Sequence, residues 1–170
     1  DSILYIFCSS FLMSFAFHPI GMHYIALFAL FPILYLSISL KTWREFAATG
    51  YVYGLFFYSL SMFWLNYNEG TSGVVSFITF FASVLYLSLF PMLIFTVLGI
   101  LRKRFSSSFI LLPFIWVSVE YLNSIGQLGF PWFVIGNAMA PSNLVIQIVE
   151  FTGIYGVSFW IVLSNVIAFQ

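Results

Sequence analysis

Long apolar blocks separated by short polar or Gly/Pro-containing breaks dominate this sequence. The whole chain of 170 residues carries five Lys or Arg and five Asp or Glu side chains. A soluble domain has about a quarter of its residues charged, so this chain cannot cover a globular surface in water. Blocks of this length instead indicate helices surrounded by lipid. The sequence therefore predicts an all-α fold, a polytopic transmembrane helical bundle.

Six apolar stretches are long enough to be considered as spans, given that a spanning helix needs about 20 residues. They are approximately residues 3–17, 24–40, 46–65, 74–101, 109–125 and 144–169. The fourth contains Pro91, which predicts a kink or tilt. We expect residues 1–170 to form a single transmembrane helical domain. Because the chain starts with Asp1 and ends within an apolar stretch, we expect it to be a fragment of a longer protein.

The basic residues predict an orientation in the membrane. Lys41 and Arg44 lie between the second and third stretches, and residues 102–104 (Arg-Lys-Arg) lie between the fourth and fifth. Two intervening spans put both clusters on the same side, and loops rich in Lys and Arg are typically cytoplasmic. We therefore predict that loops 41–45 and 102–107 face the cytoplasm. Net charge is zero, so there is no basic surface to attract nucleic acid.

The connection between the fifth and sixth stretches, residues 120–137, is the candidate site. It is too apolar for a solvated loop and too interrupted by Gly and Pro for a regular span. Phe130, Pro131 and Trp132 would lie at the membrane interface and contact lipid. The alternative is a turn that only anchors two helices.

Ionisable residues at membrane depth are costly and are candidates for function. Glu120 lies near the outer end of the fifth stretch, and Asn123, one helical turn later, shares its face and is placed to hydrogen-bond it. The alternative for Glu120 is a boundary carboxylate in interfacial water. Glu150 is a secondary candidate, with a structural hydrogen bond to a neighbouring helix as the favoured role.

Residues of the usual catalytic or metal-binding types are not suitably placed. His18 and His23 are five apart across a Pro-Gly turn, which is not the spacing of a helical metal pair. Cys8 lies in an apolar stretch with no cationic neighbour, so its thiol is expected to be inert. The sequence therefore predicts no catalytic residues, no metal site and no cofactor in this segment.

An ordered series of short motifs resembles the apolipoprotein N-acyltransferases of diderm bacteria. The strongest match is Trp116-x-x-x-Glu120 followed by Gly129-Phe130-Pro131-Trp132 and Gly136. Supporting matches are Gln147, the run Gly153-Ile-Tyr155-Gly156-Val-Ser158-Phe159, Phe15-Ala-Phe-His-Pro19, Gly50, Gly54, Trp64-Leu65, Gly70 and Gly73. The series covers the whole chain but only about the first third of a full family member. Two positions depart from the family pattern: Asn123 stands where Arg is typical, and Ala138-Met139 stand where a Gln often follows.

The resemblance implies an acyltransferase of lipoprotein biosynthesis in the bacterial inner membrane. Such enzymes move an acyl chain from a phospholipid to the N-terminal diacylglyceryl-cysteine of an apolipoprotein. Their Glu-Lys-Cys triad belongs to a nitrilase-like domain that would follow this segment, so the segment alone is predicted to be inactive. It would anchor that domain and shape lipid access, with Glu120, Phe130, Pro131 and Trp132 as contact candidates. The alternatives are a small transporter or channel subunit, with Glu120 and Glu150 lining a pathway, and a non-catalytic membrane anchor.

Overall fold

The computed structural model describes residues 2–17, 20–67, 70, 72–105 and 108–170. All regular elements within these residues are α-helices or short 3₁₀ helices, labelled η, which confirms the predicted all-α class. The order along the chain is α1 (Ser2–Ala16), η1 (His23–Leu27), α2 (Phe31–Ser39), α3 (Trp43–Ser61), η2 (Phe63–Tyr67), α4 (Gly73–Leu87), α5 (Leu89–Arg102), η3 (Ser108–Leu111), α6 (Leu112–Ser124), η4 (Pro131–Phe133), η5 (Ile135–Met139), α7 (Asn143–Ile146) and α8 (Val149–Phe169).

Two helical segments are long and apolar enough to cross a membrane, judged by length and composition. They are Gly73–Arg102 and Val149–Phe169. Shorter apolar helices occupy Ser2–Ala16, His23–Ser39 and Ser108–Ser124. The structure thus supports a helical membrane domain, while a bundle of six full spans remains an expectation from the sequence.

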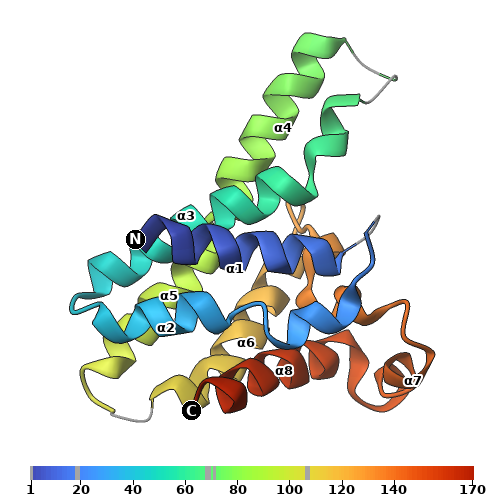
Figure 1. The fold of residues 1–170 in the computed structure, drawn as a ribbon. Helices are drawn as coiled ribbons and strands as arrows, with labels where there is room; N and C mark the ends of the chain where they lie inside the picture. The colour runs from blue at the N-terminus through green and yellow to red at the C-terminus, as the bar shows by residue number, and fades with distance from the viewer. Residues whose placement is uncertain (1, 18–19, 68–69, 71, 106–107) are drawn as a thin grey trace.

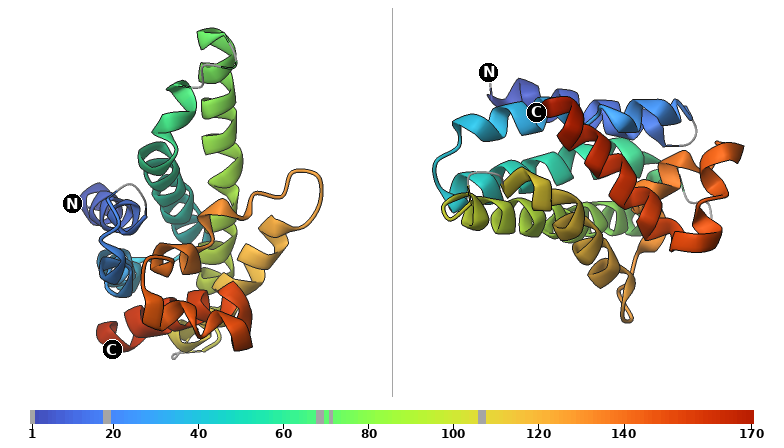
Figure 2. Two further views of the ribbon diagram at one scale, coloured as in Figure 1. Left: turned by 90° about the vertical axis from the view of Figure 1, so that its right-hand side faces the viewer. Right: turned by 90° about the horizontal axis from the view of Figure 1, so that it is seen from below.

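The fourth apolar stretch forms two helices rather than one. α4 ends at Leu87 and α5 begins at Leu89, so the break lies one turn before Pro91. Pro91 has no backbone N–H for the carbonyl group of Leu87, and its ring crowds that carbonyl. The Ser88 hydroxyl donates to the Val84 carbonyl oxygen at 2.6 Å, a bond that often accompanies a helix bend. Beyond this break α4 projects from the rest of the molecule together with η2 (Figures 1 and 2).

The second apolar stretch, expected as one span over 24–40, is interrupted between η1 and α2. Asn165 of α8 closes the interruption: its Oδ1 accepts from the Leu30 N–H, and its Nδ2 donates to the Ala26 carbonyl oxygen, both at 2.8 Å. The hydroxyl of Ser9 donates to the carbonyl oxygen of Ala29. A backbone interruption at membrane depth requires such partners, because lipid supplies none. We call this set of residues (Ser9, Ala26, Ala29, Leu30 and Asn165) the Asn165 cluster.

Helices α3 and α5 pack with their backbones close together. A Cβ placed on Gly50 would lie 2.5 Å from the Pro91 carbonyl oxygen, and one placed on Gly54 would lie 2.7 Å from the Ser88 Cα. Any other residue would therefore overlap the facing backbone. Small residues at such positions let membrane helices approach closely, where dispersion contacts replace the hydrophobic effect as the source of association.

Arg102, from the second predicted cytoplasmic loop, contacts the end of the helix that precedes the first. The guanidinium group of Arg102 donates to the carbonyl oxygens of Ser37 and Ile38 at the C-terminal end of α2. A cation at this position stabilises the free carbonyl groups and the negative end of the helix dipole. The following helix, α3, begins with a capping box between Thr42 and Glu45, so both the end of α2 and the start of α3 have hydrogen-bond partners for their free backbone groups.

The sixth apolar stretch also differs from a single span over 144–169. It begins with the short helix α7, and α8 is broken at Gly153, whose φ of +67° is unfavourable for residues with a side chain. Beyond Gly153 the helix is regular to Phe169, and its buried face includes Val157, Ile161 and Asn165. The Ile154 carbonyl oxygen, one residue after Gly153, lies close to Gly136 of η5, where an added Cβ would be 2.5 Å from it.

Candidate functional site

The candidate site lies where α6 meets the loop 125–134, at the end of the molecule away from Arg102 (Figure 1). Trp116, Glu120 and Asn123 are spaced by four and three residues, so they share one face of α6. All three side chains are buried, at 4%, 8% and 7% exposure. A buried row of one indole, one carboxyl group and one amide is unusual in an apolar bundle and needs polar partners.

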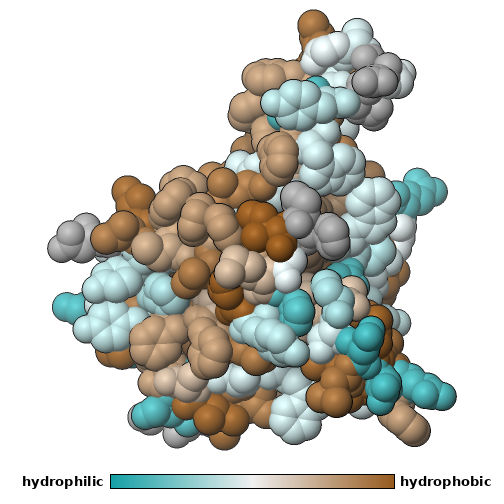
Figure 3. Space-filling model, turned by 45° about the vertical axis from the view of Figure 1, so that its right-hand side comes forward, coloured by the Kyte–Doolittle hydropathy of each residue, from teal (hydrophilic) through white to brown (hydrophobic). Residues whose placement is uncertain are grey.

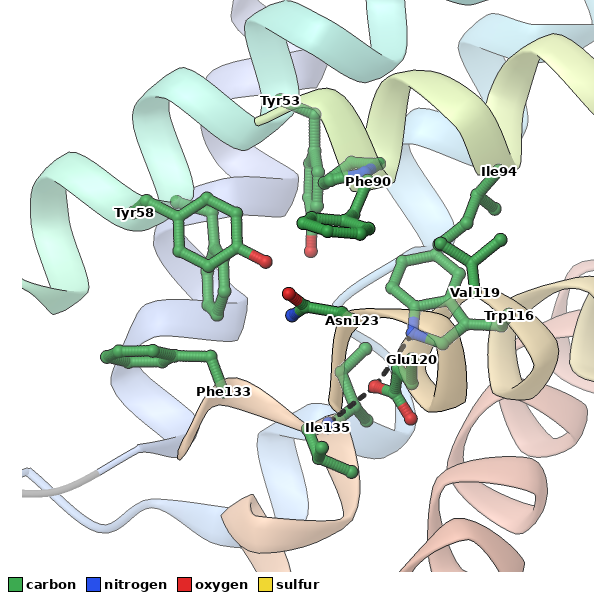
Figure 4. A pocket seen from close by; sticks show the side chains of 13 residues that line it. Tyr53, Tyr58, Phe90, Ile94, Trp116, Val119, Glu120, Asn123, Phe133 and Ile135 are labelled. Atoms are coloured by element: carbon green, nitrogen blue, oxygen red, sulfur yellow. Dashed lines mark hydrogen bonds between the residues drawn. The ribbon is translucent and has the colours of Figure 1, made fainter. Parts of the chain in front are cut away.

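Glu120 supports the far end of the loop. Its Oε1 accepts two hydrogen bonds, from the Trp116 indole N–H at 3.1 Å and from the Ile135 backbone N–H at 2.7 Å (Figure 4). Oε2 has no hydrogen-bond partner among the described residues, although the Ser158 hydroxyl lies near enough to interact with the carboxyl group. Glu120 is thus not a boundary carboxylate in interfacial water; it positions the start of η5.

Asn123 supports the near end of the same loop. Its backbone carbonyl oxygen accepts from the Phe130 N–H at 2.9 Å, and its Nδ2 donates to the Phe130 carbonyl oxygen at 3.3 Å. The expected hydrogen bond between Asn123 and Glu120 is absent from the described structure, because both side chains are directed to the loop instead. Asn123 and Glu120 therefore act in parallel, one turn apart, on Phe130 and Ile135.

A second asparagine, not singled out from the sequence, holds the middle of the loop. Asn137 Nδ2 donates to the carbonyl oxygens of Pro131 and Trp132, each at 3.1 Å. The only signal in the sequence was an amide residue six positions after Pro131. With Asn123 and Glu120, it leaves the loop little freedom although the loop has no regular secondary structure before η4.

Aromatic rings form the outer surface of this loop. We call Phe130, Pro131, Trp132 and Phe133 the aromatic loop. Trp132 is 62% exposed and Pro131 is exposed, whereas Phe130 is half-buried against the core. The Trp132 ring stacks on Trp64 of η2, with centroids 6.0 Å apart and planes inclined by 21°. Two tryptophans at one end of an apolar bundle are typical of a membrane–water interface.

Apolar side chains cover much of the remaining surface near this site. Figure 3 shows strongly apolar side chains on one side of the projecting segment and in patches over the body, with residues of intermediate hydropathy between them and strongly hydrophilic ones in a few places. On α4 the exposed residues include Val74, Phe77, Ile78 and Phe81, each between 47% and 70% exposed. Exposed apolar area on this scale is unsuited to water and fits contact with lipid.

A small cavity of about 30 Å³ lies between α3, α5, α6 and the aromatic loop. Its wall includes Tyr53, Tyr58, Phe90, Asn123 and Phe133, with Glu120 at one side. In Figure 4 the hydroxyl groups of Tyr53 and Tyr58 and the amide of Asn123 point toward its centre. Phe133 packs edge-on against Tyr58 and Phe57, at centroid distances of 5.8 and 5.9 Å, so the same ring closes the cavity and anchors the loop.

The other residues considered from the sequence do not join this site. Glu150 is exposed in the first turn of α8, rather than hydrogen-bonded to a neighbouring helix, and is not part of the cavity wall. His23 Nδ1 lies 3.0 Å from the Gly21 carbonyl oxygen, while His18 and Glu69 lie outside the described residues. Cys8 is half-buried on α1. Over the described part of the chain, no group of three or more His, Cys, Asp or Glu side chains is placed to hold a metal ion.

Fold and site together define an all-helical domain, with two helical segments long and apolar enough to cross a membrane and an aromatic loop at one end. The family described as "Apolipoprotein N-acyltransferase N-terminal domain" matches residues 9–167. The chain belongs to this family, which confirms the resemblance seen in the sequence motifs.

Relatives from several bacteria have the same name, apolipoprotein N-acyltransferase. The protein of Geobacter metallireducens is 32% identical over 166 residues, which are 95% of this chain and 32% of that protein. The protein of Chlorobaculum tepidum is 27% identical over 145 residues, 84% of this chain and 26% of its own length. That of Rickettsia prowazekii is 28% identical over 152 residues, 85% of this chain and 30% of its own length. The chain thus spans about a third or less of the relatives that it matches.

Proposed function

We propose that this chain is the membrane domain of an acyltransferase that moves an acyl chain from a phospholipid to the N-terminal diacylglyceryl-cysteine of bacterial lipoproteins. The match over residues 9–167 to the N-terminal domain of this family carries the proposal. The relatives extend well beyond the region matched here, and we assign the acyl-transfer residues to that further part, a nitrilase-like domain. The present chain anchors that domain and shapes access for its lipid substrates.

The exposed aromatic loop supports the second part of this proposal. Trp132 and Pro131 face outward beside Trp64, while Glu120, Asn123 and Asn137 fix the backbone behind them. A rigid apolar surface holds a bound acyl chain in a constant position, and the loop itself loses little conformational entropy when the acyl chain binds. In this arrangement Trp132, Pro131 and Phe130 contact lipid, and Glu120 acts on lipid only through the loop that it holds.

The rival function as a transporter or channel subunit receives less support. It required Glu120 and Glu150 to line a common pathway, as intramembrane carboxylates often do. Glu120 is buried and hydrogen-bonded to Trp116 and Ile135, whereas Glu150 is exposed and does not contribute to the same cavity. These positions favour a structural role for Glu120.

Acyl transfer by the full-length protein tests the proposal. The purified protein in detergent is incubated with phospholipid and a diacylated lipopeptide, and mass spectrometry detects the triacylated product. Trp132→Ala is expected to slow transfer about tenfold, the equivalent of about 1.4 kcal/mol, with unchanged protein level in the membrane. Trp160→Ala, which removes a similarly exposed tryptophan on α8 (58% exposed), is the matched control and should be neutral.

Absence of product from the wild-type protein would contradict the proposed reaction. A fully active and abundant Trp132→Ala protein would remove the aromatic loop from the mechanism while leaving the reaction intact. An acyl adduct on Cys8 would show that the active site lies in this segment after all.

We further propose that the domain lies in the inner membrane with the Lys41–Arg44 and Arg102–Arg104 loops in the cytoplasm and the aromatic loop on the outer side. The contacts of Arg102 with Ser37 and Ile38 support a common side for both basic loops. Single cysteines at Ser72 and Lys103, in a Cys8→Ser background, should react with an impermeant thiol reagent from opposite sides of the membrane. Reaction of both from the same side would overturn this orientation.

A further inference from the structure

Two buried polar atoms face the cavity behind the aromatic loop without a hydrogen-bond partner among the described residues. They are the Tyr53 hydroxyl and Asn123 Oδ1. The side chains that carry them are 1% and 7% exposed, so water outside the protein does not reach them freely. A buried polar atom without a partner costs about 1–3 kcal/mol, and two in one small cavity indicate a bound polar ligand.

The orientation of the Asn123 amide is fixed by its other contact. Nδ2 donates to the Phe130 carbonyl oxygen at 3.3 Å, and a flipped amide would set two oxygens against each other there. Oδ1 therefore faces the cavity as an acceptor. Tyr53 comes from α3 and both donates and accepts, and Figure 4 shows its hydroxyl group directed at the amide of Asn123. The two groups do not form a direct hydrogen bond, so a bridging ligand must offer a donor to Asn123 Oδ1 and either a donor or an acceptor to the Tyr53 hydroxyl.

We propose that this cavity binds water, with one or two molecules bridging the Tyr53 hydroxyl and Asn123 Oδ1. The cavity of about 30 Å³ accommodates that number, since one water molecule needs roughly 10–15 Å³ of such space. Water supplies two donors and two acceptors, which suits an acceptor-only amide oxygen and a phenol. The Tyr58 hydroxyl faces the same space and provides a further partner (Figure 4).

Two other occupants fit less well. A hard cation requires about six oxygen ligands, and here Glu120 Oε1 is already engaged by two N–H donors while Oε2 points away from the cavity centre (Figure 4). An acyl chain would leave both Tyr53 and Asn123 without a hydrogen bond. The bound water links α3 to the residue that holds Phe130, so it joins the aromatic loop to the centre of the bundle.

The first test is an experimental structure of the full-length protein at a resolution that shows ordered water. We expect density within about 2.6–3.2 Å of both Tyr53 Oη and Asn123 Oδ1, and its loss or displacement in Tyr53→Phe. A direct hydrogen bond between the two side chains, or continuous density of an acyl chain, would overturn the proposal.

The second test measures coupling between the two residues. Tyr53→Phe should lower the melting temperature of the full-length protein, and the same change should have a much smaller effect in an Asn123→Ala background, because the bridge is already lost. Tyr121→Phe, which removes the hydroxyl group of a tyrosine on α6 that is 55% exposed, should be neutral in both backgrounds. Equal shifts for Tyr53→Phe in both backgrounds would contradict a shared water. A melting temperature that depends on sodium against choline chloride would identify a cation instead. If Asn123→Ala does not fold, the density in wild-type and Tyr53→Phe decides the question.

Discussion

Two polar clusters are buried in this apolar bundle, and they are completed in different ways. In the Asn165 cluster, the side-chain amide uses both ends on backbone groups of the interrupted η1–α2 segment, and Nδ2 also donates to the Ile161 carbonyl oxygen. In the cluster formed by Glu120, Asn123 and Tyr53, three polar atoms have no hydrogen-bond partner among the described residues. The first cluster is closed by the protein alone, whereas the second includes room for a ligand.

The difference shows how buried polar groups with a structural role can be told apart from buried polar groups of a binding site. A fully satisfied cluster fixes one arrangement of the backbone and gains nothing from a further molecule. An incompletely satisfied cluster beside an exposed loop is where binding can lower the free energy. The unpartnered atoms lie behind the aromatic loop. They therefore indicate a binding site at this loop more directly than the presence of a carboxyl group does.

The largest effect is expected from Asn165→Leu. The change leaves the Leu30 N–H and the Ala26 carbonyl group without partners, and each buried unsatisfied group costs about 1–3 kcal/mol. We expect a severe loss of folded protein in the membrane, measured by detergent extraction and gel filtration. Ser164→Ala, in the same turn, removes a hydroxyl group that donates to the carbonyl oxygen of Ile161 at 2.7 Å and, through a longer bond of 3.3 Å, to that of Leu27. This change should have a small effect. Equal and mild effects of both changes would show that the Asn165 cluster does not hold the interruption.

A smaller and more local effect is expected from Glu120→Leu. The change removes the acceptor for the Ile135 N–H, so the loop should open more easily by about 1–3 kcal/mol, which corresponds to amide exchange faster by a factor of roughly 5 to 140. Hydrogen–deuterium exchange of residues 130–136 measures this directly. Glu120→Gln keeps an oxygen for both donors and should exchange close to the wild-type rate. If Gln were as damaging as Leu, the charge of the carboxyl group and not its hydrogen bonds would be the important property.

Part of this architecture could be predicted from the sequence. Apolar blocks and scarce charge are local properties, so they predicted the helical class. Pro91 predicted a kink or tilt, because a missing N–H acts within one turn, and the structure has two helices there. The interruption at η1–α2 could not be predicted, since it depends on Asn165, which lies 135 residues from Leu30. At the site, Glu120 stood out because carboxyl groups are costly at membrane depth. Its partner Trp116 lies one turn earlier on the same helix, but its partner Ile135 depends on the path of the loop, which the sequence does not show. Asn137 was missed for the same reason.

The contact between α3 and α5 limits how this domain can move. Gly50 and Gly54 face backbone atoms of Pro91 and Ser88 at distances that exclude a side chain. A slide of α3 by about one turn would bring Phe46 or Tyr53, which lie on the same face of α3, against the backbone that Gly50 now faces. The close contact at Gly50 and Gly54 therefore opposes sliding of α3 along α5. We therefore expect any movement that the proposed lipid access requires to occur outside this pair, in α4 beyond Ser88.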